Sequence, residues 1–146
     1  MTHLQVQLHS ARFDPLTSLV AWERQGPGQA AAASHFIGRV RATCANGQPL
    51  EALELEHYPG MTERQLEQLA AEMGERHGVE AVLVEHRIGR VLPGEAIVLV
   101  AVAADRRGPA QRCCQELLEV LKHDAPFWKR EWSGGEGTWI TGNTPL

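Results

Sequence analysis

The chain has 146 residues, of which 43% are hydrophobic and 22% are charged, and its formal net charge is -4. This length suffices for one domain with a hydrophobic core and is short for two, so we expect a single domain over residues 1–146. The composition is ordinary for a globular protein. The negative charge argues against a general nucleic-acid-binding protein, because such proteins are usually basic, but it leaves room for a local basic pocket.

The cysteines and the apolar segments bear on the cellular compartment. Cys44, Cys113 and Cys114 are odd in number and form no CxxC motif. We interpret them as reduced thiols, with the adjacent pair facing the core. No apolar run approaches the roughly 20 residues that a membrane span requires. The first residues also lack the basic and apolar regions of a signal peptide. We therefore expect a cytoplasmic protein that does not contact a membrane.

The first predicted elements are a strand and a short helix. Residues 3–8 (HLQVQL) alternate between apolar and polar side chains, which is typical of a strand. Asp14 can cap a helix that starts at Pro15, because proline suits the first helical position. The glycines and proline of residues 25–29 (QGPGQ) then predict a turn.

Two further strands are predicted before the clearest helix. Residues 30–41 are apolar and then alternating, and residues 50–58 carry regularly spaced leucines. The segment between them contains Asn46-Gly47 and Pro49, which indicate a loop or a wide hairpin connection. We therefore expect the second strand to return beside the first.

The helix predicted over residues 59–78 has signals at both ends. Thr62 and Gln65 have the spacing of a capping box at its start. Apolar residues then recur at positions i, i+3, i+4 and i+7, as on one face of a helix. Gly78 is suited to end it, because glycine readily adopts the left-handed conformation found after helix C-termini.

The second half of the chain predicts a strand pair and a second amphipathic helix. Residues 79–89 and 94–104 are rich in β-branched residues and should form an antiparallel pair. Residues 108–123 place apolar side chains at helical spacing. Pro126 should end this helix, because proline disfavours the helical conformation at the preceding residue. The glycine-rich residues 133–137 predict a turn before a last short segment.

This order of elements predicts an α+β fold. Several predicted strands follow one another too closely for crossover helices, so we expect a mostly antiparallel sheet. Two main amphipathic helices and a short N-terminal helix would pack against it. No internal repeat or low-complexity segment divides the chain.

Familiar metal, nucleotide and nucleophile motifs do not occur. The seven histidines are scattered without a metal-ligand spacing, and there is no GxGxxG, P-loop or GxSxG sequence. We therefore expect neither a metal site nor a cofactor.

Basic residues gather near the predicted ends of strands and helices. Arg41 ends one strand, Arg106 and Arg107 stand between another strand and the second long helix, and Lys122 closes that helix. An alternative explanation holds for Lys122 in particular, because cations at a helix C-terminus interact favourably with the helix dipole and are common on surfaces.

Lys129 is harder to explain as an ordinary surface residue. It lies in the stretch LKHDAPFWKREW, next to bulky aromatics that would bury it and lower its pKa, as suits a nucleophile or an acid/base group. In one continuous helix Lys122 and Lys129 would be roughly 10 Å apart on one face. A break at Pro126 lets both ammonium groups reach one anion. Arg130 would add bidentate binding of phosphate or carboxylate. The residues thus predict a pocket for a small anionic ligand.

Four stretches of the chain together resemble one known family. They resemble, in order and spacing, the large, catalytic subunit of molybdopterin synthase, over about three quarters of the chain. HYPGM and APFWKRE in combination are quite specific. The stretches are FIGRVR (36–41), LELEHYPGM (53–61), HRIGRVLPGE (86–95) and LKHDAPFWKRE (121–131).

The resemblance implies a fold and a reaction. The implied fold is of the α/β hammerhead type with an additional antiparallel β part, and the implied assembly is a homodimer with a small ubiquitin-like sulfur-carrier subunit at each end. The carrier's C-terminal Gly-Gly tail, activated as a thiocarboxylate, would enter a pocket of the large subunit. Two sulfurs would pass to cyclic pyranopterin monophosphate, giving the dithiolene of molybdopterin. No metal would be bound.

The resemblance also implies roles for particular residues. Lys122 and Lys129 match the family's two functional lysines, and Arg41 matches its strand-end arginine. Our hypothesis makes Lys129 the acid/base or carbonyl-activating group. Lys122 would hold or polarise the carrier's terminal carbonyl. Arg41 and Arg107 would hold the pterin phosphate. Phe36 would be either a wall of the pocket or a core residue.

The chain departs from the family pattern at one basic position. Many relatives carry a His-Arg pair where this chain has Arg106-Arg107. An arginine cannot shuttle protons near pH 7 as a histidine can. Either Arg106 supplies only charge at the substrate, or His86 or His123 serves instead, or the activity is altered. The segment after Trp139 is also short.

Two other function classes compete with the sulfur transferase. A non-catalytic binding module for a phosphorylated small molecule or a carrier-protein tail would use the same basic pocket. An RNA-binding protein would need a wider basic face and would show strongly salt-dependent affinity. The substitution Lys129→Ala separates the sulfur transferase from the binding module, because only an enzyme would lose turnover while still binding the carrier.

Overall fold

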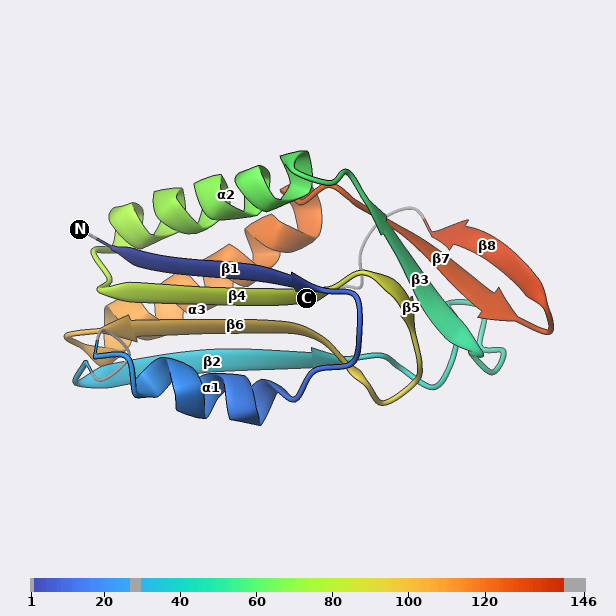
Figure 1. Ribbon diagram of the computed structural model, residues 1–146, viewed down its shortest axis with the longest axis horizontal. Helices are drawn as coiled ribbons and strands as arrows, with labels where there is room; N and C mark the ends of the chain where they lie inside the picture. The colour runs from blue at the N-terminus through green and yellow to red at the C-terminus, as the bar shows by residue number, and fades with distance from the viewer. Residues whose placement is uncertain (1, 27–29, 141–146) are drawn as a thin grey trace.

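The computed structural model describes residues 2–26 and 30–140 (Figure 1). Part of the turn predicted at 25–29 and the end of the last predicted segment lie outside them. Each predicted helix and strand is present over similar bounds, with three strands added or extended in the C-terminal half. The elements are β1 (His3–His9), α1 (Pro15–Glu23), β2 (Ala32–Arg39), β3 (Ala52–His57), α2 (Met61–His77), β4 (Ala81–Arg87), β5 (Gly89–Val91), β6 (Ala96–Ala104), α3 (Arg107–Asp124), β7 (Phe127–Ser133) and β8 (Glu136–Ile140).

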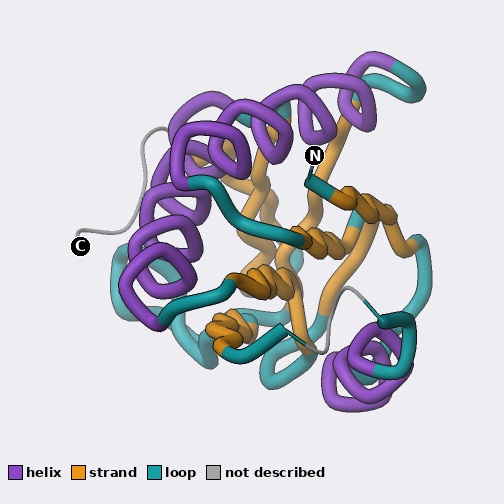
Figure 2. The backbone as a smooth tube through the Cα atoms, turned by 90° about the vertical axis from the view of Figure 1, so that its left-hand side faces the viewer, coloured by secondary structure: helices purple, strands orange, loops and turns teal. Residues whose placement is uncertain are grey.

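The first sheet has the strand order β1-β4-β6-β2 and lies between helices (Figures 1 and 2). β4 and β6 are antiparallel, as predicted, and only β1 and β4 pair in parallel. α2 and α3 cover one face, and α1 covers the other. Both central strands are buried almost throughout, since each face is covered. The predicted α+β class and the mostly antiparallel sheet are thus confirmed.

The second sheet has the order β5-β3-β7-β8 and is entirely antiparallel. The prediction that residues 50–58 return beside residues 30–41 is wrong, because β2 pairs with β6 in the first sheet while β3 pairs with β5 and β7 in the second. The intervening segment carries the chain from one sheet to the other (Figure 1). Long-range partners therefore overrode the local hairpin signal.

β7 and β8 form a hairpin that the sequence showed only as a turn. Ser133 pairs with Glu136, so Gly134 and Gly135 make a two-residue loop, and both have positive φ angles. Two positive φ angles are what a type I′ hairpin turn requires, and glycine adopts them without strain.

The two sheets share part of their packing. The main core lies between the first sheet and helices α2 and α3, and a smaller cluster under the second sheet includes Leu55 and Val91. Ile97 and Phe127 pack against both clusters. These two residues therefore join the two clusters where the sheets meet. Because Phe127 is the first residue of β7, its packing fixes the position of β7 relative to α3.

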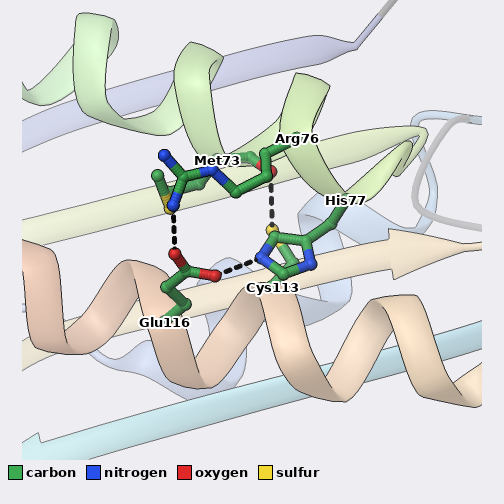
Figure 3. Close-up of polar contacts among 5 residues, drawn as sticks. All are labelled: Met73, Arg76, His77, Cys113 and Glu116. Carbon is green, nitrogen blue, oxygen red and sulfur yellow. Dashed lines mark hydrogen bonds and ion pairs between the residues drawn. The ribbon is translucent and has the colours of Figure 1, made fainter.

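Polar contacts also join α2 to α3 (Figure 3). Glu116 of α3 accepts from Arg76 and contacts His77 at the end of α2, and these contacts lower the pKa of Glu116, with the His77 hydrogen bond contributing most. Cys113 donates to the carbonyl of Met73 across 3.6 Å. Burial raises the pKa of Cys113 to about 12, so this thiol is a core residue, as predicted, and unreactive at neutral pH.

The two ends of α2 differ in how well they match the predicted capping signals. The capping box predicted from Thr62 and Gln65 is wrong by two residues, because Gly60 is the N-cap and its N–H donates to the Glu63 carboxylate at 3.1 Å. The Thr62 hydroxyl is buried and instead accepts from Tyr58 N–H and donates to the carbonyl of Pro126. Gly78 ends the helix at a φ of 64°, as predicted. Thr62 thus links the start of α2 to the start of β7.

Candidate active site

A pocket of about 710 Å³ lies where the two sheets meet the end of α3. Its walls come from the end of β2, the end of β4, the start of β6, the last turns of α3 and one face of β7. Its volume is in the range typical of small-molecule sites. Four of its polar residues are lysines or arginines and one is a carboxylate; the polar residues are Arg39, Arg41, Thr43, His86, Lys122, His123, Lys129 and Glu131.

Lys122 and Lys129 both line this pocket, although they belong to different elements. Lys122 lies in the last turn of α3, which ends at Asp124. Ala125 is extended, with a ψ of 135°, as expected for a residue before proline. β7 starts directly after Pro126 and carries Lys129 back beside the helix end. The break predicted at Pro126 is confirmed, and its consequence is a pocket that two lysines share.

Lys129 is poised differently from an ordinary surface lysine. Burial, and next the positive charge of Lys122, lower the pKa of Lys129 below its usual 10.5. Among the described residues no carboxylate lies within 4 Å of its ammonium group to offset these effects. A lysine with a lowered pKa is a better nucleophile or general acid/base near neutral pH.

The end of β2 brings further cationic groups to the pocket. Phe36, Arg39 and Arg41 all line it, and both arginines are exposed. The pairing with β6 shifts register between Gly38 and Arg39. A Cβ at Gly38 would lie 2.9 Å from Cγ1 of Val98, so the side chain of Val98 occupies the space that a larger residue would need there. Phe36 is 38% exposed, which identifies it as a pocket wall and not a core residue.

Glu131 is the one carboxylate among the described lining residues, and it has a structural partner. Its two oxygens accept from the backbone N–H of Ala45 at 3.1 and 3.3 Å. Ala45 lies in the segment that follows Arg41 and Thr43. These hydrogen bonds hold that segment against β7 and offset part of the negative charge of Glu131.

Arg130 is a correction to the predicted site. Because side chains alternate along a strand, Lys129 faces the pocket and its neighbour Arg130 faces the opposite side of the sheet. There its guanidinium lies 4.1 Å from the ring centroid of Trp139 and forms an ion pair with Glu54 at 3.6 Å. Trp128 shares that outer face, where it is 43% exposed against Tyr58, so it does not bury Lys129 as expected.

Arg106 and Arg107 do not line the pocket of their own chain. They stand at the start of α3, whereas Lys122 stands in its last turn. Arg107 and Lys122 are therefore roughly 22 Å apart along the helix axis, at 1.5 Å per residue. Both arginines are exposed, and within one chain neither can meet an anion held by Arg41.

Two residues that line the pocket, Arg39 and Glu131, were not predicted from the sequence. Arg39 had a signal, because it stands two residues before Arg41 in a predicted strand and the period of two places both on one face. Glu131 had none, since residues 127–133 were not recognised as a strand and a carboxylate contradicts a simple anion pocket. His86 and His123, considered as alternatives to Arg106, do line the pocket.

The substitution Lys129→Met is expected to stabilise the protein at neutral pH. The folded state disfavours the charged lysine, and this cost is present below the lowered pKa and is relieved as the pH rises toward 10.5. We expect the free energy of unfolding to increase by about 0.5–2 kcal/mol at pH 7. This is the usual gain when a residue that serves function at a cost in stability is replaced. Urea unfolding at several pH values would measure this. A loss of stability at pH 7, or a gain that persists unchanged above pH 10.5, would contradict it.

Fold and site together define an α+β protein with a pocket of small-molecule size that is lined by lysine and arginine side chains. None of the described helices is long and apolar enough to cross a membrane. The family model described as MoaE protein matches residues 8–124 of the chain. The chain belongs to the MoaE family.

Relatives and solved structures agree with this membership. The molybdopterin synthase catalytic subunit of Ralstonia nicotianae is 39% identical over 135 residues, covering 92% of this chain and 76% of the relative. That of Pseudomonas aeruginosa is 39% identical over 139 residues, covering 95% and 91%. The structure of the molybdopterin biosynthesis MoaE protein from Burkholderia ambifaria is 40% identical, with a TM-score of 0.76 over 96% of this chain and 89% of that one.

A more distant structure shares the fold. It is a complex of subunits 1 and 2 of molybdopterin-converting factor from Helicobacter pylori, which is 22% identical with a TM-score of 0.74, covering 93% of this chain and 88% of that one. The architecture is thus retained at low sequence identity.

Proposed function

We propose that the chain is the catalytic subunit of a molybdopterin synthase. It transfers sulfur from the C-terminal thiocarboxylate of a small ubiquitin-like carrier to cyclic pyranopterin monophosphate, giving molybdopterin. The observation that carries this proposal is the shared pocket of Lys122 and Lys129, with the pKa of Lys129 lowered. The names of the relatives support the same activity.

The charge of the pocket suits both reactants. A thiocarboxylate and a cyclic phosphate are anions, and bringing them together requires fixed positive charge, which also stabilises negative charge that develops during transfer. Arg39, Arg41, Lys122 and Lys129 supply it from three elements and one adjoining segment. Lys122 and Lys129 are partly buried, so their charges act more strongly than they would in water.

Each pocket residue has a role in this proposal. Lys129 is the acid/base or carbonyl-activating group next to the thiocarboxylate. Lys122 holds or polarises the carrier's terminal carbonyl, and its charge also helps to lower the pKa of Lys129. Arg41 holds the pterin phosphate, and Phe36 is a wall against which a flat pterin ring can lie.

Arg106 and Arg107 enter the proposal through a second copy of the chain. β2 is an edge strand of the first sheet. Its first residue pairs with Ala104, close to Arg107, while its other end leads to Arg41 and the pocket. Two copies related by a two-fold axis through their β2 edges would therefore bring Arg107 of one copy to the pocket of the other. This arrangement supports the expected homodimer, with one carrier on each copy.

The proposal includes a cytoplasmic location and one continuous domain. All three cysteines are buried and unpaired, as is usual in a reducing compartment. The packing of Ile97 and Phe127 against both core clusters supports treating the two sheets as one domain.

A reconstituted reaction tests the proposed function. We expect the purified chain to convert cyclic pyranopterin monophosphate to the dithiolene product when it is given a carrier with a C-terminal Gly-Gly thiocarboxylate, with the product followed by mass spectrometry. The same carrier with an ordinary carboxylate is the control and should give no product. Tight binding of the thiocarboxylated carrier without any transfer would favour the non-catalytic binding module instead.

A further inference from the structure

His86 is a buried pocket residue for which the proposed function has so far assigned no role. It is the sixth residue of β4, is 8% exposed and lines the pocket together with Lys129. Its ring stacks on Phe127, with centroids 4.1 Å apart and planes 13° from parallel. Phe127 and Lys129 are two positions apart in β7 and so share its pocket face.

The hydrogen bond of His86 fixes which of its nitrogens carries a proton. Nδ1 lies 2.8 Å from the carbonyl oxygen of Arg87, and a carbonyl can only accept, so Nδ1 donates. Burial, opposed by this hydrogen bond and assisted by the charge of Lys129, lowers the pKa of His86 to about 4. The ring is therefore neutral at pH 7, and its Nε2 has a free lone pair.

A neutral ring of this kind is not a proton shuttle. A shuttle near pH 7 needs a pKa close to that value. The pKa of His86 is about 4, so its ring does not readily take up a proton at pH 7. His86 therefore does not replace the histidine that many relatives have where this chain has Arg106. What it offers is a hydrogen-bond acceptor in a pocket that otherwise presents mostly donors.

The donors that face the same space come from three elements and one adjoining segment. Lys122 and His123 project from α3, Arg39 from the end of β2 and Arg41 from the residues just after it. Lys129 projects from β7, on the face that also carries Phe127. The charge of Lys129 contributes, beside burial, to the lowered pKa of His86.

We propose that His86 is a positioning residue whose Nε2 accepts a hydrogen bond from the ammonium group of Lys129. The stack on Phe127 and the bond to the Arg87 carbonyl hold the ring, and the ring in turn holds Lys129 toward the substrates. This inference rests on the proposed function only in naming what Lys129 is positioned for. Both side chains line the same pocket, so the proposed hydrogen bond between them can be tested without turnover.

Two amide substitutions separate the two nitrogens of His86. In His86→Asn the side-chain amide can still donate to the Arg87 carbonyl, but nothing occupies the place of Nε2. In His86→Gln the longer side chain puts an amide oxygen near the place of Nε2. His86→Phe keeps the stack on Phe127 and removes both nitrogens. Thermal melting of all three variants shows which of them retain the fold.

The first readout is the titration of Lys129 itself. The pH dependence of its reaction with an amine-modifying reagent, measured by peptide mass spectrometry, gives its pKa directly. Losing an acceptor for the ammonium group should lower that pKa by about one unit in His86→Asn and His86→Phe and leave it nearly unchanged in His86→Gln. An unchanged Lys129 titration in folded His86→Phe would overturn the proposal, as would equal shifts in the Asn and Gln variants.

The second readout is sulfur transfer. A positioning role predicts a kcat about tenfold lower in His86→Asn and His86→Phe, with the KM for the carrier nearly unchanged and activity largely kept in His86→Gln. A raised KM with unchanged kcat would contradict it. Failure of the proposed function is distinguishable, since the wild-type chain would then give no product while the Lys129 titrations would still respond to His86.

Discussion

The substitution Lys129→Ala is expected to lower the rate of sulfur transfer by about 100- to 10,000-fold, the range that a positioned acid/base group contributes. The ammonium group of Lys129 faces the pocket beside Lys122, and burial has lowered its pKa toward neutrality. Alanine removes the group without adding a new charge. Single-turnover transfer from a thiocarboxylated carrier would measure the loss, with carrier affinity measured separately and expected to change little.

The matched control for this substitution is the next residue along the strand. Arg130→Ala also removes a cation from β7, but from the face that carries Trp132 and Trp139. Its rate of transfer should stay close to that of the wild type, even if its melting temperature falls. Undiminished turnover in Lys129→Ala would refute the catalytic role of Lys129. Equal losses in both variants would show that charge near β7, and not the pocket lysine, matters.

A mixed dimer is expected to recover activity that each parent has lost. Arg41→Ala and Arg107→Ala should each be severely impaired as homodimers, because each removes one of the cations assigned to the pterin phosphate. Unfolding and reassembling the two variants together gives half mixed dimers. In each of these, one site combines both intact arginines and the other lacks both. About a quarter of all sites should then be intact, with activity in that proportion.

Two outcomes would contradict the shared site. If the mixture is no more active than its parents, Arg41 and Arg107 do not meet across two copies. If Arg107→Ala alone is fully active, the arginine has no part in the reaction, and its exposed position at the start of α3 is only structural. A chain carrying both substitutions, mixed with wild type, is the control, because its mixed dimers contain no intact site.

The stretch LKHDAPFWKREW shows how far the residues alone lead. Its proline, lysines and aromatics predicted a broken helix and an anion pocket. The end of α3 before Pro126 confirms the break, and Lys122 and Lys129 line one pocket, whose binding of an anion stays a prediction. The sequence did not reveal that the residues after Pro126 form a strand. For that reason the faces of Arg130 and Trp128 were assigned wrongly, since alternation can be applied only once a strand is recognised.

Local signals determined the elements of this protein. Helical spacing, Pro126 and Gly78 set where the long helices run and end, because these effects act within a few residues. The family resemblance indicated the reaction. The tertiary structure alone decided which strands share a sheet, which cations share a pocket and that Arg107 lies far from Arg41. Those outcomes depend on contacts between distant segments, and their energies do not appear in any short window of sequence.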